Sequence, residues 1–294
     1  MQKRRITRFA TLSLIVLSAG IAVYFLVLTR GRPAPIPTKE TLYEGVTYQR
    51  VVRYCPNAMI AHIIKIDTKA KGIQFLITPA DSKSETPLNA RTTSQFLDEF
   101  GLQIAINGDG FTPWWSRGPA DYYPHAGDPV APLGFTASNG DDYWKGVELD
   151  EGERPTLYIS RRNAFSFNDK PNRVHNAISG DRMIVLQGQP VAGLNDSELN
   201  PRTAIGLNRN GRYVYLIVVD GRQPFYSAGI TFADLAQLLI DHDVYVAMSL
   251  DGGGSSTIVM EGENGEPVIL NSPIDNYIPG RERPVANHIG VYVP

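Results

Sequence analysis

Short apolar runs separated by polar turns dominate the chain after its first forty residues, and they predict strands more often than helices. Residues 60–66 and 73–77 are rich in isoleucine, and the Lys71-Gly72 turn signal between them predicts a hairpin. Residues 102–106 form a further apolar run that stops at a polar pair. We therefore expect a mixed β-sheet core.

Helical periodicity is scarcer along the chain. Residues 93–100 predict a short helix with threonine near its start and Gly101 just past its end. Residues 183–186 and 190–192 flank a turn at 187–189. The pattern as a whole predicts an α+β fold in which a mixed β-sheet core carries few helices.

The best-defined unit of the pattern lies between residues 201 and 250. Residues 213–219 and 244–250 read as continuous apolar strands, and between them Thr231 precedes a helix with one apolar face. A strand, helix and strand in one sheet normally run parallel, which would place Asp220 and Asp251 at the same edge.

A third strand brings further charged residues to this edge. Residues 204–207 turn through 208–211 into the strand that starts at Tyr213, so the two strands are expected to pair. This pairing would place Arg202 opposite the end of that strand, close to Asp220 and Arg222. Taken singly, each charged residue also fits an ordinary turn or a surface ion pair. Their convergence favours a functional site.

The loop after the second apolar strand contains an acid, three glycines and two serines. These residues are Asp251, Gly252, Gly253, Gly254, Ser255 and Ser256. Glycines let a ligand approach the main chain, and free N–H groups and hydroxyls can hold an anion. The plainer interpretation is a tight loop between two strands, with residues 257–260 resuming the sheet.

The segment 111–144 has little regular pattern and holds all three tryptophans, Trp114, Trp115 and Trp144. Long irregular segments inside a compact domain often carry function. Aromatic faces flanked by polar groups suit the apolar faces of sugar rings, although the same side chains could simply pack the segment onto the sheet. Both interpretations stay open at this point.

The N-terminus predicts a location. Basic residues at positions 3–8 precede an uncharged apolar run at 9–28, about the length that a bilayer-spanning helix requires. Positive charge before the span favours a cytoplasmic start and an extracytoplasmic, periplasmic or extracellular body. A cleaved signal peptide is the alternative, but Leu28-Thr29-Arg30 is a poor cleavage site. We therefore expect a single-pass, uncleaved membrane anchor.

The domain organisation follows from these segments. We expect a cytoplasmic start and transmembrane anchor at residues 1–29, a proline-rich linker at 30–47, and a single catalytic domain at 48–294. The formal net charge of −2 gives no basic field, so nucleic acid is not expected as a partner. The single cysteine, Cys55, excludes an internal disulfide, and no zinc-spacing motif is present, so we expect no metal and no cofactor.

Several ordered motifs resemble the phosphodiester glycosidase family. The resemblance runs from about Tyr48 to the C-terminus and rests on Asn107-Gly108 with Phe111, Ser179-Gly180, PRTAIG at 201–206, VDGR at 219–222, Gly229 with Asp234-Leu235, LDGGGSS at 250–256 and RPVAN at 283–287. It implies an α+β catalytic domain that hydrolyses a sugar 1-phosphodiester and takes a phosphate-containing carbohydrate as partner. One departure is Asp109, an additional acid that bears on the substrate pocket.

Chemistry assigns roles within this resemblance. Phosphate is a good leaving group, so arginine neutralisation can replace protonation, while a carboxylate stabilises the oxocarbenium-like sugar. We expect Asp251 to be that carboxylate and Asp220 the second acid or base, with Arg202 among the catalytic residues. The expected substrate-binding residues are Asn107, Thr203, Arg222, residues 252–256 (Gly252, Gly253, Gly254, Ser255 and Ser256), Arg283, Trp114 and Trp115.

Two other classes of function remain open from the sequence. The chain could be a factor that binds glycan phosphates without hydrolysing them, in exopolysaccharide or cell-envelope assembly. It could also be a phosphoesterase that cuts the bond between oxygen and phosphorus, a reaction that usually employs metal ligands.

Overall fold

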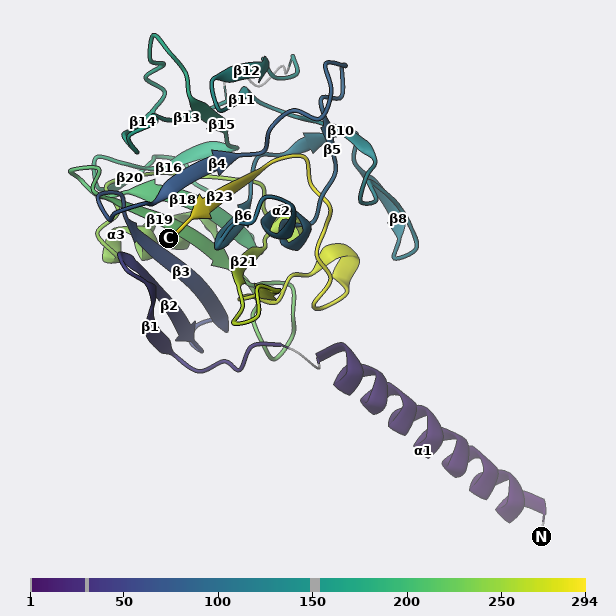
Figure 1. Ribbon diagram of the computed structural model, residues 1–294. Helices are drawn as coiled ribbons and strands as arrows, with labels where there is room; N and C mark the ends of the chain where they lie inside the picture. The colour runs from purple at the N-terminus through teal and green to yellow at the C-terminus, as the bar shows by residue number, and fades with distance from the viewer. Residues whose placement is uncertain (1, 30–31, 149–153) are drawn as a thin grey trace.

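Antiparallel strands form most of the body in the computed structural model, which describes residues 2–29, 32–148 and 154–294 (Figure 1). The largest sheet, called the large sheet below, pairs its strands in the order β1 (Thr38–Tyr43), β2 (Val46–Arg53), β3 (Met59–Asp67), β19 (Tyr213–Val219), β18 (Arg202–Leu207), β20 (Val246–Ser249), β16 (Arg182–Leu186) and β17 (Gln189–Pro190). Each neighbouring pair in it is antiparallel.

Two five-stranded antiparallel sheets accompany it. The second sheet has the order β22 (Pro267–Ile269), β21 (Ile258–Glu261), β6 (Ile104–Asn107), β23 (His288–Tyr292) and β4 (Gln74–Ile77). The third sheet has the order β12 (Asp141–Trp144), β11 (Thr136–Ser138), β15 (Asn176–Ser179), β13 (Thr156–Ile159) and β14 (Phe165–Phe167). A small sheet contains β5 (Leu88–Asn89), β10 (Pro129–Pro132) and β7 (Phe111–Thr112), and β8 (Trp115–Gly118) pairs with β9 (Asp121–Tyr123).

Three α-helices complete the described part of the chain: α1 (Gln2–Thr29), α2 (Thr93–Glu99) and α3 (Phe232–Asp241), together with the short 3-10 turns η1 (Gly253–Ser255) and η2 (Asp275–Tyr277). The Thr92 hydroxyl and the Gln95 side chain close a capping box at the start of α2, and the Thr231 hydroxyl accepts a hydrogen bond from the Asp234 amide at the start of α3. Both predicted body helices are therefore confirmed.

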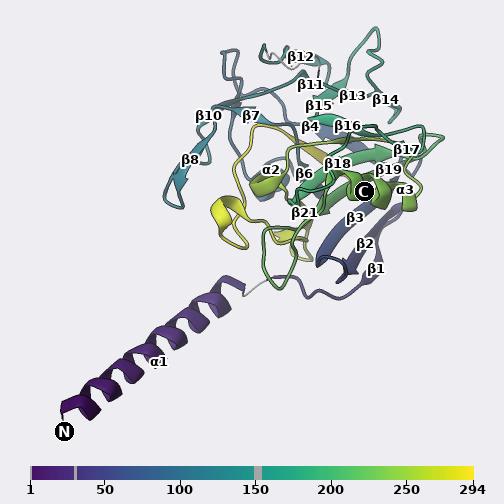
Figure 2. The ribbon, with the colours of Figure 1, turned by 180° about the vertical axis from the view of Figure 1, so that it is seen from behind.

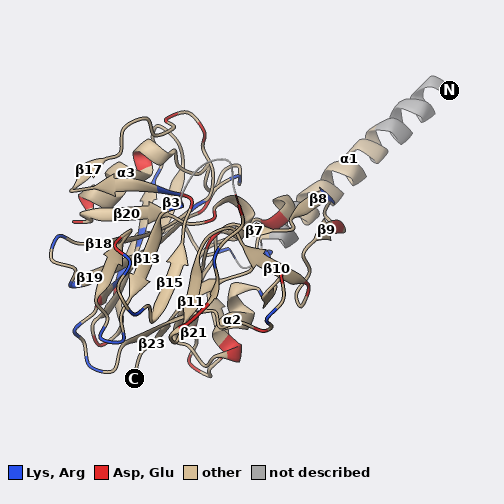
Figure 3. Cartoon of the chain, turned by 90° about the horizontal axis from the view of Figure 1, so that it is seen from above, with Lys and Arg blue, Asp and Glu red and all other residues tan. Residues whose placement is uncertain are grey.

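The main core lies between the sheets, and strand alternation determines which residues enter it. In β19, Val214, Leu216 and Val218 join this core with residues of the other two sheets. The intervening residues of β19, such as Ile217, face α3 on the opposite side of the large sheet. Figure 2 shows α3 beside the large sheet, and α2 packs against the second sheet. Lys and Arg segments are interspersed with Asp and Glu segments over the body (Figure 3).

The strand-helix-strand unit agrees with its prediction. Because β19 and β20 both pair antiparallel with β18, they run parallel to each other on its two sides. Their carboxyl ends therefore meet at one edge of the large sheet, where β18 begins. The predicted pairing of β18 with β19 is also confirmed, with Arg202 opposite Val219.

The predicted hairpin of residues 60–66 and 73–77 is wrong. β3 pairs with β2 and β19 in the large sheet, whereas β4 pairs with β23 in the second sheet. Both strands are mostly buried. The turn at Lys71-Gly72 reverses the chain but carries it from one packed sheet to the other.

Helix α1 covers the stretch for which an anchor is predicted and extends away from the body (Figures 1 and 2). Within the described residues, no helix combines the length and apolar character needed to cross a membrane. The predicted anchor is therefore not confirmed. Residues 30 and 31 of the predicted linker lie outside the described residues.

Candidate active site

The candidate site lies at one edge of the large sheet, where β19 and β20 end and β18 begins. Strand pairing sets Arg202 opposite Val219 and Ala204 opposite Ser249. The loops after β19 and β20 and the chain before β18 consequently lie together. The convergence predicted for Arg202, Arg222 and Asp251 is present in the fold.

A cavity of about 380 Å³ opens at this edge, and we call it the site cavity. Its lining residues are Gly110, Trp114, Leu133, Arg154, Asp181, Asn200, Arg202, Arg222, Phe232, Leu250, Asp251, Gly252, Gly253, Gly254 and Arg283. Four arginines and two carboxylates line it. Such a cavity combines positive charge for an anion with a carboxylate for chemistry.

Main-chain hydrogen bonds hold Asp251 at the start of the loop that follows β20. Its N–H donates to the Gly108 carbonyl at 2.9 Å, and its carbonyl accepts from Asn107 Nδ2 at 2.8 Å. Burial raises the pKa of the Asp251 carboxyl to about 6, although a hydrogen bond from Ser255 and the positive charge of Arg283 act to lower it. The carboxyl can therefore change protonation state close to neutral pH.

Asn107 and Thr203 support Asp251 from within the core and do not line the site cavity. Asn107 Oδ1 accepts from the Thr203 hydroxyl at 2.9 Å and from the Thr257 amide at 3.1 Å. The same side chain holds the Asp251 carbonyl. Both residues were expected to bind substrate, but their contacts make them positioning residues.

Two of the cavity arginines are held by oxygen acceptors on neighbouring loops. Arg222 donates from Nε and Nη2 to Asn200 Oδ1 at 3.0 and 2.9 Å. Arg283 donates from Nε to Asp275 Oδ1 at 2.7 Å and from Nη1 to the Ser255 hydroxyl at 3.3 Å. The guanidinium groups are thereby oriented before any ligand arrives, which favours tight binding of a phosphate.

Arg202 is held differently, by an aromatic ring. Its guanidinium carbon lies 3.7 Å from the centroid of Phe232, the first residue of α3. Burial lowers the pKa of Arg202 from its usual value, while the charges of Asp181 and Glu198 oppose this effect. Its Nε is buried without a hydrogen-bond partner among the described residues. Arg202 itself lines the site cavity.

Two of the three glycines, Gly253 and Gly254, allow the main chain to approach these guanidinium groups. A Cβ atom on Gly253 would lie 3.1 Å from Arg222 Nη1, and the φ of Gly253 is +62°. A Cβ atom on Gly254 would lie 2.8 Å from Arg283 Cζ. The loop and the arginines therefore form one packed unit. Ser255 and Ser256 lie just behind it and are buried.

The structure does not bring Asp220 into the site cavity. Asp220 is buried, and its Oδ2 accepts from His62 Nε2 at 3.1 Å. Its Oδ1 accepts from Asn271 Nδ2 at 3.1 Å and from the Ser272 amide at 2.8 Å. The prediction that Asp220 faces the substrate beside Asp251 is wrong in its geometry, because the Asp220 carboxylate is taken up by these internal contacts.

Strand alternation explains this separation of the two acids. Asp220 continues the even-numbered face of β19, where Val218 enters the core between the sheets. Asp251 follows Leu250, which belongs to that same core, so the next side chain points to the opposite face. Alternation separates Arg202 and Thr203 in the same way. Arg202 shares the outward face with Phe232.

A buried acid that the sequence marked only as a departure lies beneath the cavity. Asp109 accepts hydrogen bonds from the Gly110 amide at 2.8 Å, the Gly134 amide at 2.7 Å and Arg154 Nη2 at 2.6 Å. Burial raises its pKa, while the charge of Arg154 opposes that shift. The negative charge of Asp109 also raises the pKa of Asp251.

Only one of the predicted aromatic residues reaches the site cavity. Trp114 lines it, half-exposed, with the Arg283 guanidinium carbon 5.0 Å from its ring centroid. Trp115 instead stacks against Tyr123 with centroids 6.3 Å apart. Trp144 donates from Nε1 to the Pro132 carbonyl at 2.7 Å. Trp115 and Trp144 thus contribute to the packing of the aromatic segment.

The lining residues that sequence reasoning missed include Arg154, Asp181, Asn200 and Phe232. Two of them adjoin quoted motifs, since Asp181 follows Ser179-Gly180 and Asn200 precedes the motif that starts at Pro201. Their position beside these motifs could have indicated Asp181 and Asn200 as site residues, whereas Arg154 reaches the cavity only through tertiary packing. Among the residues that the structure describes, no group of three or more His, Cys, Asp and Glu side chains could hold a metal ion.

Known proteins resemble the chain in sequence. Residues 100–292 match the sequence profile of the family described as phosphodiester glycosidase. Bovine N-acetylglucosamine-1-phosphodiester alpha-N-acetylglucosaminidase is 42% identical over 64 residues, which are 22% of this chain and 12% of the bovine protein. The SPbeta prophage-derived uncharacterized protein YomE of Bacillus subtilis is 37% identical over 95 residues, 32% of this chain and 13% of that protein. The matched segments thus span about an eighth of these relatives.

Solved structures share the fold. A hypothetical protein from Synechocystis superposes with a TM-score of 0.59 at 15% identity, covering 89% of this chain and 64% of that chain. The catalytic domain of zebrafish N-acetylglucosamine-1-phosphodiester alpha-N-acetylglucosaminidase, auto-inhibited by its pro-peptide, gives a TM-score of 0.57 at 16% identity, covering 91% and 93% of the two chains. At these identities the likeness concerns the fold.

Proposed function

The chain belongs to the phosphodiester glycosidase family, and from this premise we propose that its body hydrolyses the bond between a sugar and a phosphodiester, releasing the sugar. One observation carries the proposal: the Asp251 carboxyl, with its pKa raised to about 6, lies in one cavity with Arg154, Arg202, Arg222 and Arg283. The name of the bovine relative suggests an N-acetylglucosamine 1-phosphodiester as the first substrate to test.

The arginines would carry the phosphate side of the reaction. When the bond between the anomeric carbon and the phosphate oxygen breaks, its electron pair moves onto that oxygen. The leaving group is then a phosphate monoester, whose additional negative charge the guanidinium groups stabilise. Because this leaving group is weakly basic, it needs little proton donation.

Asp251 would carry the sugar side of the reaction. As a carboxylate, it can either attack the anomeric carbon or take a proton from the attacking water, and in both cases its charge stabilises the oxocarbenium-like state. Asp181 is the other carboxylate among the described residues that line the cavity, so it takes the place that the sequence assigned to Asp220.

Hydrolysis in oxygen-18 water tests the proposed function directly. We expect the soluble body to place the label in the released sugar, because water attacks carbon. Label in the phosphate would show a phosphoesterase. Binding of the phosphodiester without turnover would instead show a glycan-phosphate-binding factor.

Arg202→Lys should separate charge from shape at the phosphate position. Lysine keeps the charge but lacks the planar guanidinium group that lies on Phe232. We therefore expect kcat/KM for the phosphodiester to fall by an amount that corresponds to a loss of about 1–3 kcal/mol of transition-state stabilisation. Arg209→Lys is the matched control, because the Arg209 guanidinium also lies over an aromatic ring, 5.0 Å from the Tyr245 centroid, but does not line the site cavity. Equal losses in both variants would contradict the assigned role.

Trp114→Ala tests whether an aromatic face holds the sugar. We expect substrate binding to weaken by roughly 1–3 kcal/mol with an unchanged melting temperature, because Trp114 is half-exposed and lines the cavity. Trp115→Ala is the matched control and should leave binding intact. Loss of binding in the control alone would show that the sugar lies elsewhere.

We also propose that the body works outside the cytoplasm. The proposal is supported by basic residues at positions 3–8 ahead of the apolar run at 9–28. In cells whose cytoplasmic membrane is intact, protease added from outside should digest the body once any outer membrane or wall has been made permeable. A body that becomes digestible only after lysis of the cytoplasmic membrane would refute this location.

A further inference from the structure

Two more cavities adjoin the site cavity along the third sheet. One of about 470 Å³, here called the bridge cavity, shares Leu133 and Arg154 with the site cavity. The other, of about 670 Å³, is here called the sheet cavity, and it shares Lys170 with the bridge cavity. The shared residues make the three cavities immediate neighbours.

Basic residues predominate among the charged residues that line the two added cavities. Arg154, Lys145, Lys170, Arg161 and Arg173 line them, and Asp142 is the one acid among their described lining residues. Asp142 pairs with Lys145, and Arg154 pairs with the buried Asp109. Among the described residues, no carboxylate lies within ion-pairing distance of Arg161, Lys170 or Arg173. Their positive charge is therefore not neutralised by ion pairs within the described fold.

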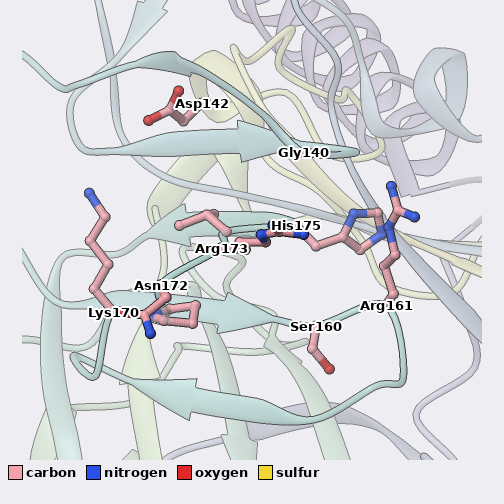
Figure 4. A pocket seen from close by; sticks show the side chains of 10 residues that line it. Gly140, Asp142, Ser160, Arg161, Lys170, Asn172, Arg173 and His175 are labelled. Carbon is pink, nitrogen blue, oxygen red and sulfur yellow. The ribbon is translucent and has the colours of Figure 1, made fainter.

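Figure 4 shows how these groups lie in the sheet cavity. The Lys170 and Arg161 side chains lie toward its two ends, and Arg173 and His175 lie between them in this view. Burial and the nearby Arg161 lower the pKa of His175, which favours its neutral form. The fixed positive charge of the cavity thus comes from arginine and lysine, the side chains that bind phosphate oxygens.

Aromatic surface accompanies the charge in the bridge cavity. Phe135 and Tyr158 line it, and the ammonium groups of Lys145 and Lys170 lie 5.3 and 4.9 Å from the Phe135 ring centroid. Aromatic faces suit sugar rings, and cations beside them suit phosphates. The bridge cavity therefore holds groups suited to a sugar ring and groups suited to a phosphate.

We propose that the site, bridge and sheet cavities form one extended binding groove for a polymer of sugars joined by phosphodiesters. Resting on the proposed function, this inference names the substrate class: the bond cut at Asp251 belongs to a polyanionic chain whose further repeats occupy the two basic cavities. Cleavage of a single sugar 1-phosphodiester needs only the site cavity. The added charge and volume serve the rest of the chain.

The test compares a short and a long substrate. The short one is the methyl ester of N-acetylglucosamine 1-phosphate, and the long one is an oligomer of four N-acetylglucosamine 1-phosphate units. In the double variant Arg161→Gln/Arg173→Gln we expect kcat/KM for the oligomer to fall by at least about fivefold, as for the loss of two exposed charge contacts. The value for the methyl ester should not change.

A matched control removes two exposed cations that line none of the three cavities, in the variant Arg53→Gln/Lys71→Gln. It should leave both substrates unaffected, and added salt should reduce the wild-type preference for the oligomer. Equal effects of the Arg161 and Arg173 changes on both substrates, or an equal loss in the control, would overturn the groove.

Binding to the Asp251→Asn protein separates this inference from the proposed function. If the wild type turns over neither substrate, the proposed function fails, but the groove still predicts tighter binding of the oligomer than of the methyl ester, weakened by the Arg161 and Arg173 changes. Poly-glutamate of similar charge should bind more weakly than the oligomer. Equal binding of poly-glutamate would reduce the groove to a general polyanion patch and refute its glycan specificity.

Discussion

Asp251→Asn is expected to lower kcat/KM for a sugar 1-phosphodiester by on the order of 10³-fold or more, without lowering the melting temperature. Asparagine keeps the size of the side chain but can neither attack carbon nor accept a proton from water. The main-chain contacts to Gly108 and Asn107 that hold residue 251 do not involve the side chain. Assays of kcat/KM beside thermal unfolding provide the measurement, and near-normal activity would show that the reaction centre lies elsewhere.

The pH dependence of the wild type follows from the same carboxyl. Burial raises the pKa of Asp251 to about 6, and the proposed chemistry needs the ionised form. We therefore expect kcat/KM to fall as the pH drops below about 6 and to level off above it. A rate that instead rises toward acid pH would assign Asp251 the role of proton donor.

The contribution of Asp251 to folding stability changes with pH in the opposite direction to that of an acid whose pKa is lowered by a salt bridge. Because the folded pKa lies above the ordinary value of 3.8, the folded state binds more protons than the unfolded state between those two values. Asp251 therefore lowers stability as the pH rises from about 4 to about 6. At neutral pH the asparagine variant lacks this penalty, so its melting temperature should equal or exceed that of the wild type.

Asp109→Asn should have the largest effect on folding. The change removes the charge that faces Arg154 in a pair whose carboxylate side chain is fully buried, and loss of one partner of a buried pair costs about 3–5 kcal/mol. The free energy of unfolding in urea is the measurement. The control is Asp67→Asn, which breaks the exposed pair with Arg212 and should cost about 1 kcal/mol or less.

The Asp109 variant should also shift the activity profile. Since the charge of Asp109 raises the pKa of Asp251, its removal should move the acid limb of kcat/KM to lower pH. Adding Arg154→Gln should recover part of the lost stability, because it removes the unpaired cation. Equal costs for the Asp109 and Asp67 variants, with no movement of the acid limb, would contradict this account.

The sequence predicted those parts of the fold that depend on neighbouring residues. Thr231 and the apolar face behind it were enough to predict α3, and the turn at 208–211 was enough to pair β18 with β19. The turn at Lys71-Gly72 misled because β3 and β4 satisfy their hydrogen bonds in different sheets. A turn signal specifies a change of direction, whereas partners are chosen by tertiary packing.

The candidate site was predicted in the same uneven way. Asp251, Arg202, Arg222 and the glycine loop were found because strand ends place them at one edge. Asp220 was assigned to the same pocket because only the edge was considered and the alternation of faces along β19 was not. The pair of Asp109 and Arg154 joins residues 45 positions apart, and no local pattern predicts it.

The contact between Gly254 and the Arg283 guanidinium limits which substitutions are possible at these two positions. A methyl group at position 254 would collide with the arginine, so any side chain there requires the arginine to be absent or displaced. Loss of Arg283, in turn, would remove the closest contacts of such a side chain and leave the Asp275 Cα at 3.2 Å as the next one. The two positions, 29 residues apart, are therefore expected to vary together across divergent chains of this fold, as a correlated pair rather than as two independently fixed sites.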